Sequence, residues 1–256
     1  MKYINNINKD KFKLSFNDTN KPFRYAIIDN FFDENECKTF SDSYPDKDDE
    51  LWYRFRDVIH GEENVFERRM MGISNIDQLP KIGLEIINEL NSKKFVKLLR
   101  ELTGIPELIN DTHNEIGQWA GIRAMLPGAY QSIHSDARKH PHLGIEKRIT
   151  LVGYLNQDWK EEDGGYTEVW NNTMTSCVDK VAPKYNRVLL FENTDKSYHG
   201  VPEVNNYRKT FLTSYLLDSE EFNETRPKAR FMKRPNEGKT EVWDKLSAIR
   251  ENLKDY

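Results

Sequence analysis

The second half of the chain is a succession of short apolar runs separated by turn residues. Runs rich in β-branched and aromatic residues occur at 117–126, 130–134, 148–155, 166–170, 177–182, 187–192 and 209–217. Seven or more short strands of this kind predict a β-sandwich or barrel rather than alternating strands and helices. The pair Gly164 and Gly165 follows an acidic run and fits a tight turn with positive φ.

One of these runs ends in a pair of metal-ligand types. His134 and Asp136 are two residues apart, so on a strand their side chains project from one face. His199 follows the apolar run 188–191, which predicts a buried strand ending shortly before it. Two histidines and one carboxylate on one face of Fe(II) leave three positions open for substrates. Arg208 begins the last strand, where its guanidinium suits a buried carboxylate.

Each of these residues also has an ordinary interpretation. An isolated His-x-Asp pair is often a solvated turn, and a lone histidine such as His199 is often structural. His140 and His142 flank a proline in a polar stretch, so we predict that they face the surface or a substrate rather than a metal. The order of His-x-Asp, strands, histidine and arginine favours a metal site over these alternatives.

With this order the sequence resembles the Fe(II)/2-oxoglutarate-dependent dioxygenases, in particular the prolyl 4-hydroxylase-like branch. The resemblance covers about residues 119–217 and rests on His134-x-Asp136, ITLVGYLNQDWKEEDGG with EVW, VAP with NRVLLF, His199-Gly and Arg208-x-Thr210. It implies a double-stranded β-helix core, the cupin-like jelly-roll, within a mainly β fold with flanking helices (α+β).

The resemblance also implies roles for individual residues. His134, Asp136 and His199 correspond to the iron ligands, and Arg208 to the residue that binds the far carboxylate of 2-oxoglutarate. Thr210, Tyr154 and Thr150 match positions that assist this contact, although Tyr154 and Thr150 could instead be core residues. The branch often has a tyrosine directly before a Pro-Gly pair, where this chain has Leu126. Arg123 or Tyr130 could replace its contacts.

The expected activity is hydroxylation of an unactivated C–H bond, with 2-oxoglutarate and O2 converted to succinate and CO2. Fe(II) and 2-oxoglutarate are the implied cofactor and cosubstrate, and ascorbate is expected to support turnover. The branch suggests a prolyl residue in a peptide or protein as substrate. A free amino acid or another small molecule is the first alternative, and a non-catalytic jelly-roll binding module is the second.

The first half predicts a support for this core. Residues 1–22 suggest an irregular lead-in, 23–32 a strand, and 33–36 the acidic start of a helix. Residues 51–69 mix aromatics and arginines without clear periodicity, which suits either a lid over the iron or a peripheral helix. Residues 79–103 carry apolar residues three and four apart, predicting amphipathic helices with a break at Asn91-Ser92 and an end at Gly104.

Composition limits the class of partner. The net charge is -4 and 37% of the 256 residues are hydrophobic, which suits one domain: support at 23–104, core at 117–218, and an extended arm with a final helix at 219–256. We expect no nucleic-acid or membrane partner, because charge is nearly balanced and no long apolar run exists. The two cysteines form no recognisable framework. We therefore expect a cytoplasmic protein, monomeric or homodimeric.

Overall fold

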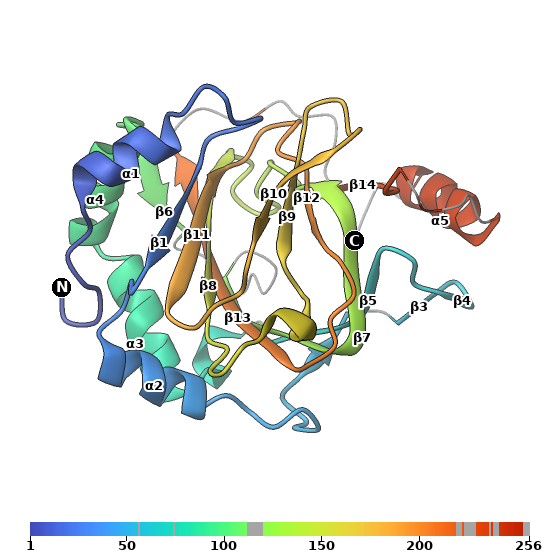
Figure 1. Ribbon diagram of the computed structural model, residues 1–256, viewed down its shortest axis with the longest axis horizontal. Helices are drawn as coiled ribbons and strands as arrows, with labels where there is room; N and C mark the ends of the chain where they lie inside the picture. Colours follow the sequence, from blue (N-terminus) through green and yellow to red (C-terminus); the bar gives the residue numbers. More distant parts are fainter. Residues whose placement is uncertain are drawn as a thin grey trace.

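The computed structural model describes residues 1–55, 57–73, 75–111, 120–218, 222, 229–235, 237 and 241–252. Most described strands join one antiparallel sheet that curls into a nearly closed barrel, in the order β1-β11-β8-β13-β7-β12-β9-β10 (Figure 1). These strands are β1 (Tyr25–Asp29), β7 (Gly121–Ser135), β8 (Lys147–Tyr154), β9 (Thr167–Trp170), β10 (Cys177–Val181), β11 (Arg187–Glu192), β12 (His199–Val201) and β13 (Arg208–Leu217). The prediction of a mainly β, double-stranded β-helix core is confirmed.

The strand prediction was wrong at one place in this barrel. Residues 117–126 and 130–134 were expected to be two strands, but β7 continues through Pro127 and Gly128 as a single strand. Gly128 has a φ of 80° and its N–H donates to the carbonyl of Val204 at 2.7 Å. The Pro-Gly pair therefore bends one long strand instead of ending it, and residues 117–119 lie outside the described residues.

Four helices cover the sheet on the side of β1, β6 (Leu108–Asn110) and β8 (Figure 1). They are α1 (Lys9–Phe16), α2 (Glu34–Asp42), α3 (Lys81–Leu90) and α4 (Lys93–Thr103). The break between α3 and α4 and the left-handed Gly104 that ends α4 are as predicted. The prediction of an irregular lead-in at residues 1–22 was wrong, because α1 forms there and buries Phe12 and Phe16, which lie four residues apart. Apolar side chains of these helices and of the sheet form the main hydrophobic core.

The described residues between 51 and 73 form short strands and no helix, so the peripheral-helix alternative was wrong. They comprise β2 (Tyr53–Arg54), the hairpin of β3 (Val58–Ile59) and β4 (Glu62–Glu63), and β5 (Glu67–Ile73), with a 3-10 turn η1 (Ile76–Gln78) after them. Pairing of β5 with β7 widens the sheet. Whether this region acts as a lid stays a prediction.

The C-terminal segment returns to the barrel. Strand β14 (Arg230–Met232) pairs with the end of β7, and α5 (Glu241–Asn252) lies beyond it (Figure 1). Trp243 and Leu246 of α5 pack against Phe66 and Phe231, so the final helix docks on its own chain. Residues 238–240, directly before this helix, and most of 219–228 lie outside the described residues. Among the described helices, none is long and apolar enough to cross a membrane.

Candidate metal centre and anion clamp

Strands β7 and β12 bring the three predicted metal ligands together. The two strands pair antiparallel with His199 opposite His134, and Asp136 follows the last residue of β7. One ligand atom from each of His134, Asp136 and His199 lies within 4.8 Å of the others. The carboxylate Oδ1 is 3.3 Å from Nε2 of His134 and 3.8 Å from Nε2 of His199.

Both imidazoles are oriented by a hydrogen bond to the backbone carbonyl two residues earlier in the chain. Nδ1 of His134 donates to the carbonyl of Ser132 at 3.0 Å, and Nδ1 of His199 donates to that of Ser197 at 2.9 Å. In a neutral imidazole this leaves the Nε2 lone pair free. Burial lowers the pKa of His199 to about 4, so this ring is neutral at pH 7. The Nε2 atoms of both rings and a carboxylate oxygen therefore lie close together, which suits a bound cation.

Asp136 has an ion-pair partner that the sequence did not reveal. Nζ of Lys147, the first residue of β8, lies 2.6 Å from Oδ2 of Asp136, the oxygen that points away from the histidines. Burial alone would raise the pKa of Asp136, but Lys147 and the histidines hold it well below its usual range. The lysine thus keeps the carboxylate ionised and fixes which oxygen faces the imidazoles.

Arg208 is buried in the barrel interior with Tyr154 and Thr167. Its Nε donates to the carbonyl of Gly165 at 2.8 Å and its Nη2 to Oγ1 of Thr167 at 3.1 Å. The Tyr154 hydroxyl lies 2.8 Å from the same Oγ1, and the guanidinium lies 5.3 Å from the Tyr154 ring centre. Gly165 has a φ of 67°, as predicted for the Gly-Gly turn, and a Cβ there would lie 3.0 Å from Cδ of Arg208. Thr167 was missed, because its place between Tyr154 and Arg208 depends on packing between β8, β9 and β13.

The two predicted threonines lie on strands next to this cluster, each with another partner. Thr210 is opposite Tyr154 in the register of β8 and β13, and its hydroxyl lies 3.5 Å from the carbonyl of Arg123. The Thr150 hydroxyl accepts a hydrogen bond from the side-chain amide of Asn193 at 3.0 Å. Their contacts with 2-oxoglutarate stay a prediction.

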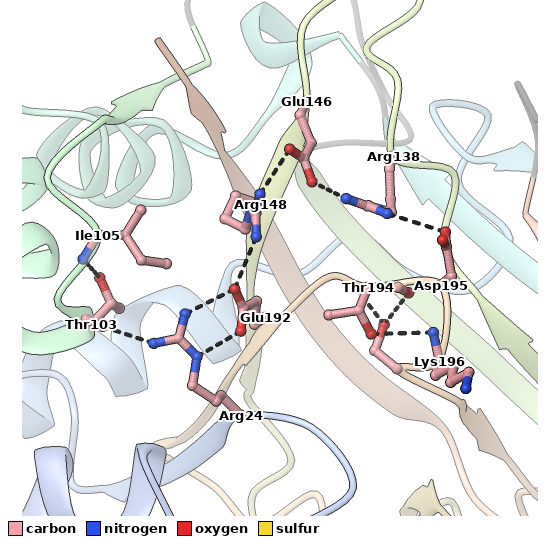
Figure 2. Close-up of polar contacts among 11 residues, drawn as sticks. Arg24, Thr103, Ile105, Arg138, Glu146, Arg148, Glu192, Thr194, Asp195 and Lys196 are labelled. Carbon is pink, nitrogen blue, oxygen red and sulfur yellow. Dashed lines mark hydrogen bonds and ion pairs between the residues drawn. The ribbon is translucent and has the colours of Figure 1, made fainter. Parts of the chain in front are cut away.

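Six charged residues are linked one to the next by ion pairs (Figure 2). We call this set the ion-pair chain, and its members are, in order, Arg24, Glu192, Arg148, Glu146, Arg138 and Asp195. Arg138 contacts both Glu146 and Asp195, so it joins the segment after Asp136 to the segment before His199. The sequence shows these charges but not their partners.

His140 is placed differently from the prediction. Its side chain is fully buried, with Nδ1 accepting from the backbone N–H groups of His142 and Leu143 at 3.2 and 3.0 Å. Its Nε2 lies 3.3 Å from Oδ2 of Asp111. His140 is therefore a structural residue of its turn rather than a surface or substrate-facing one, whereas His142 is exposed as expected.

Comparisons with known proteins agree with this fold. Residues 120–217, which hold every strand from β7 to β13, match the family model of the 2OG-Fe(II) oxygenase superfamily. The resemblance to that superfamily is therefore confirmed over these residues. A search of curated proteins found no match.

Solved structures with the same fold include prolyl hydroxylases. A prolyl-4-hydroxylase from Pseudomonas putida is 12% identical with a TM-score of 0.56, covering 81% of this chain and 99% of that one. A Trichoplax adhaerens prolyl hydroxylase, solved with a hypoxia inducible factor peptide fragment, is 17% identical with a TM-score of 0.56, covering 82% and 90%. An oxidoreductase of the 2OG-Fe(II) oxygenase family from Burkholderia pseudomallei is 14% identical with a TM-score of 0.54, covering 87% and 97%. At these identities the likeness concerns the fold.

Proposed function

We propose that this protein is an Fe(II)- and 2-oxoglutarate-dependent dioxygenase that hydroxylates a prolyl residue in a peptide or protein. The observation that carries the proposal is the convergence of His134, Asp136 and His199 within 4.8 Å, with both imidazoles held by backbone carbonyls. We treat residues 1–256 as one catalytic unit, because the support helices and the C-terminal segment both pack onto the barrel.

The side chains fit the proposed cofactors chemically. Two imidazoles and one carboxylate are a donor set that suits Fe(II). Arg208 would hold the far carboxylate of 2-oxoglutarate, with the Tyr154 and Thr167 hydroxyls beside it. When bound, Fe(II) and 2-oxoglutarate would supply with O2 an oxidant that hydroxylates a C–H bond, as 2-oxoglutarate becomes succinate and CO2.

The chain itself provides orientation and exclusion of water. Lys147 fixes the Asp136 carboxylate, and Phe191 and Phe231 lie with ring centres 4.8 Å from His199 and 5.2 Å from His134. An apolar, closely packed shell strengthens the electrostatic contacts inside it. These residues would hold the ligands in one arrangement before the substrate arrives.

The choice of a prolyl substrate has indirect support. Two similar folds are those of prolyl hydroxylases, one solved with a peptide. Tyr53 and Val58 are large apolar residues that stay more than half exposed, on β2, which pairs with β5 of the sheet, and on β3 of the separate β3-β4 hairpin. Such a surface offers contacts for an extended peptide.

The test is succinate formation from 2-oxoglutarate by the full chain with Fe(II) and ascorbate, with and without proline-containing peptides. We expect peptide-stimulated succinate and a peptide mass gain of about one oxygen atom. His134→Ala and Asp136→Ala should abolish succinate, whereas His142→Ala, which replaces an exposed histidine, should not. Retained turnover in both ligand variants would contradict the ligand assignment. Succinate without peptide stimulation would redirect the substrate search to free amino acids and other small molecules, and no succinate at all would favour a binding module.

A further inference from the structure

Arg123 is a buried cation that forms no ion pair with the residues that the structure describes. Its side chain is 5% exposed, Nη1 donates to the carbonyl of Ile122 at 3.0 Å, and Nη2 has no hydrogen-bond partner among the described residues. Glu67 acts on it electrostatically, but that carboxylate accepts from Gln131 at 3.2 Å and forms no ion pair with Arg123. A buried charge without a partner is costly, so its presence indicates a role in binding rather than in stability.

The guanidinium lies on the same face of the sheet as Arg208. On β7, Ile122 and Ala124 belong to the main core, so Arg123 and Met125 face the opposite side. Met125 lies opposite Arg208 in register, and its Sδ is 3.6 Å from Nη1 of Arg208. The two arginines are therefore neighbours along the barrel interior.

The Arg123 guanidinium lies between a glycine, whose missing side chain leaves room for it, and an aromatic ring. Gly72 of β5 lies opposite Arg123, and a Cβ there would lie 2.6 Å from Nη1 of the arginine. On the other side the Phe55 ring centre is 5.4 Å from the guanidinium. Phe55 is only partly buried and follows the two-residue strand β2, so its ring is the cover that a ligand would have to displace to reach the guanidinium.

We propose that Arg123 binds a carboxylate of the primary substrate beneath Phe55. The inference rests on the proposed function, in which the metal centre and Arg208 already account for both carboxylates of 2-oxoglutarate. A further cation in the same interior then requires a further anion. One guanidinium among apolar side chains balances a single charge, which favours a carboxylate over a doubly charged phosphate. The substrate is thus an acidic peptide or a free amino acid.

The direct test uses propionate as the carboxylate probe. The full chain is melted with saturating 2-oxoglutarate, so that Arg208 is engaged, in sodium propionate and in sodium chloride of equal ionic strength. At ten times its dissociation constant, propionate should raise Tm by about 3–6 °C in the wild type. Arg123→Met should remove this rise, and Gly72→Ala, which displaces the guanidinium, should reduce it. Arg54→Met, which removes an exposed arginine of β2, should leave it intact.

The stability of the variant separates binding from structure. Replacing an unpaired buried charge by an apolar side chain of similar length should leave Tm in chloride unchanged or raise it. A Tm well below that of the wild type would overturn the inference, because Arg123 would then be structural. An unchanged propionate rise in Arg123→Met would overturn it as well.

Substrate assays then separate this inference from the proposed function. The melts need neither iron nor turnover, so a propionate effect without succinate formation would contradict the proposed function alone. Where peptides stimulate succinate, replacing their Asp and Glu by Asn and Gln should reduce stimulation at least ~10-fold in the wild type and little in Arg123→Met. A stimulating free amino acid should likewise lose its effect when its carboxylate is amidated. Equal losses in both proteins would show that another residue recognises the carboxylate and would overturn the assignment.

Discussion

Replacing Glu146 by glutamine removes the negative charge that two arginines share in the ion-pair chain. Its side chain is 6% exposed and accepts from Arg138 and from Nη2 of Arg148, the latter at 2.9 Å (Figure 2). The Nε atoms of both arginines are buried without a hydrogen-bond partner among the described residues. Glutamine keeps the size of the side chain but leaves the two guanidinium groups without their shared counter-charge.

The cost follows from how deeply the partners are buried. Removing one member of a fully buried ion pair costs about 3–5 kcal/mol. The side chains of Arg138 and Arg148 are 14% and 27% exposed, so solvent partly stabilises them in the variant. We therefore expect a loss of about 2–3 kcal/mol in the free energy of unfolding. For a chain of this size, a loss of that magnitude lowers Tm by about 4–12 °C.

Thermal unfolding of Glu146→Gln beside the wild type measures this loss. Glu203→Gln, which neutralises an exposed glutamate, is the control and should melt with the wild type. Because Arg138 joins the segments that carry Asp136 and His199, titration with Mn(II), a spectroscopically visible substitute for iron, should also show weaker metal binding. A variant that melts with the wild type would refute the reasoning, since the ion-pair chain would then contribute no stability.

Three other predictions concern separate parts of the molecule. Burial alone would raise the pKa of Glu192, but its hydrogen bonds with Arg24 hold the pKa below the ordinary 4.5. The stabilisation by the Glu192 carboxylate is thus complete above its ordinary pKa and lost as pH falls through the lower folded pKa. In urea unfolding, the loss of unfolding free energy caused by Glu192→Gln should therefore shrink below pH 4.5. A loss that does not change with pH would contradict this. Thr167→Val removes the hydroxyl beside the arginine clamp and should raise KM for 2-oxoglutarate at least ~10-fold, whereas an unchanged KM would exclude Thr167 from the clamp. Gly153→Ala would place a Cβ 1.8 Å from the Phe211 ring and should cost about 1–3 kcal/mol in thermal unfolding, with a wild-type Tm as the contrary result.

The sequence predicted what depends on local pattern. The barrel strands follow from alternating residue types and turn signals, and the approach of His134 and His199 follows from a family motif whose spacing this chain preserves. Helix α1 escaped prediction because only Phe12 and Phe16 mark its buried face within a run of lysines and polar residues. The sequence predicts two strands in place of β7 because Pro-Gly is a turn signal. In the structure, neighbouring strands on both sides provide hydrogen bonds to the β7 backbone, and the strand continues.

What the sequence could not predict are pairings between distant strands. Lys147 is eleven residues from Asp136, and its sequence context is that of an ordinary lysine at the start of a strand. Only the assembled sheet, in which β13 lies between β8 and β7, brings its Nζ to the Asp136 carboxylate. Thr167 lies far along the chain from Arg208, and only the packing of two strands makes its hydroxyl a shared partner. The burial of His140 likewise depends on Asp111, which lies on a separate segment. Such contacts result from the assembled sheet and leave no periodic signal.

The position of β14 has a consequence for how this protein is made. Phe231 pairs with His134, so the strand that carries a metal ligand receives one of its neighbours from a segment synthesised much later. Until that segment leaves the ribosome, this end of β7 is an open strand edge, able to pair with other chains. Closing such a long loop is also entropically slow. The region around His134 is therefore among the last parts of the barrel to be sealed, and the newly made chain passes through a period in which metal ions can reach the centre and aggregation is most easily seeded.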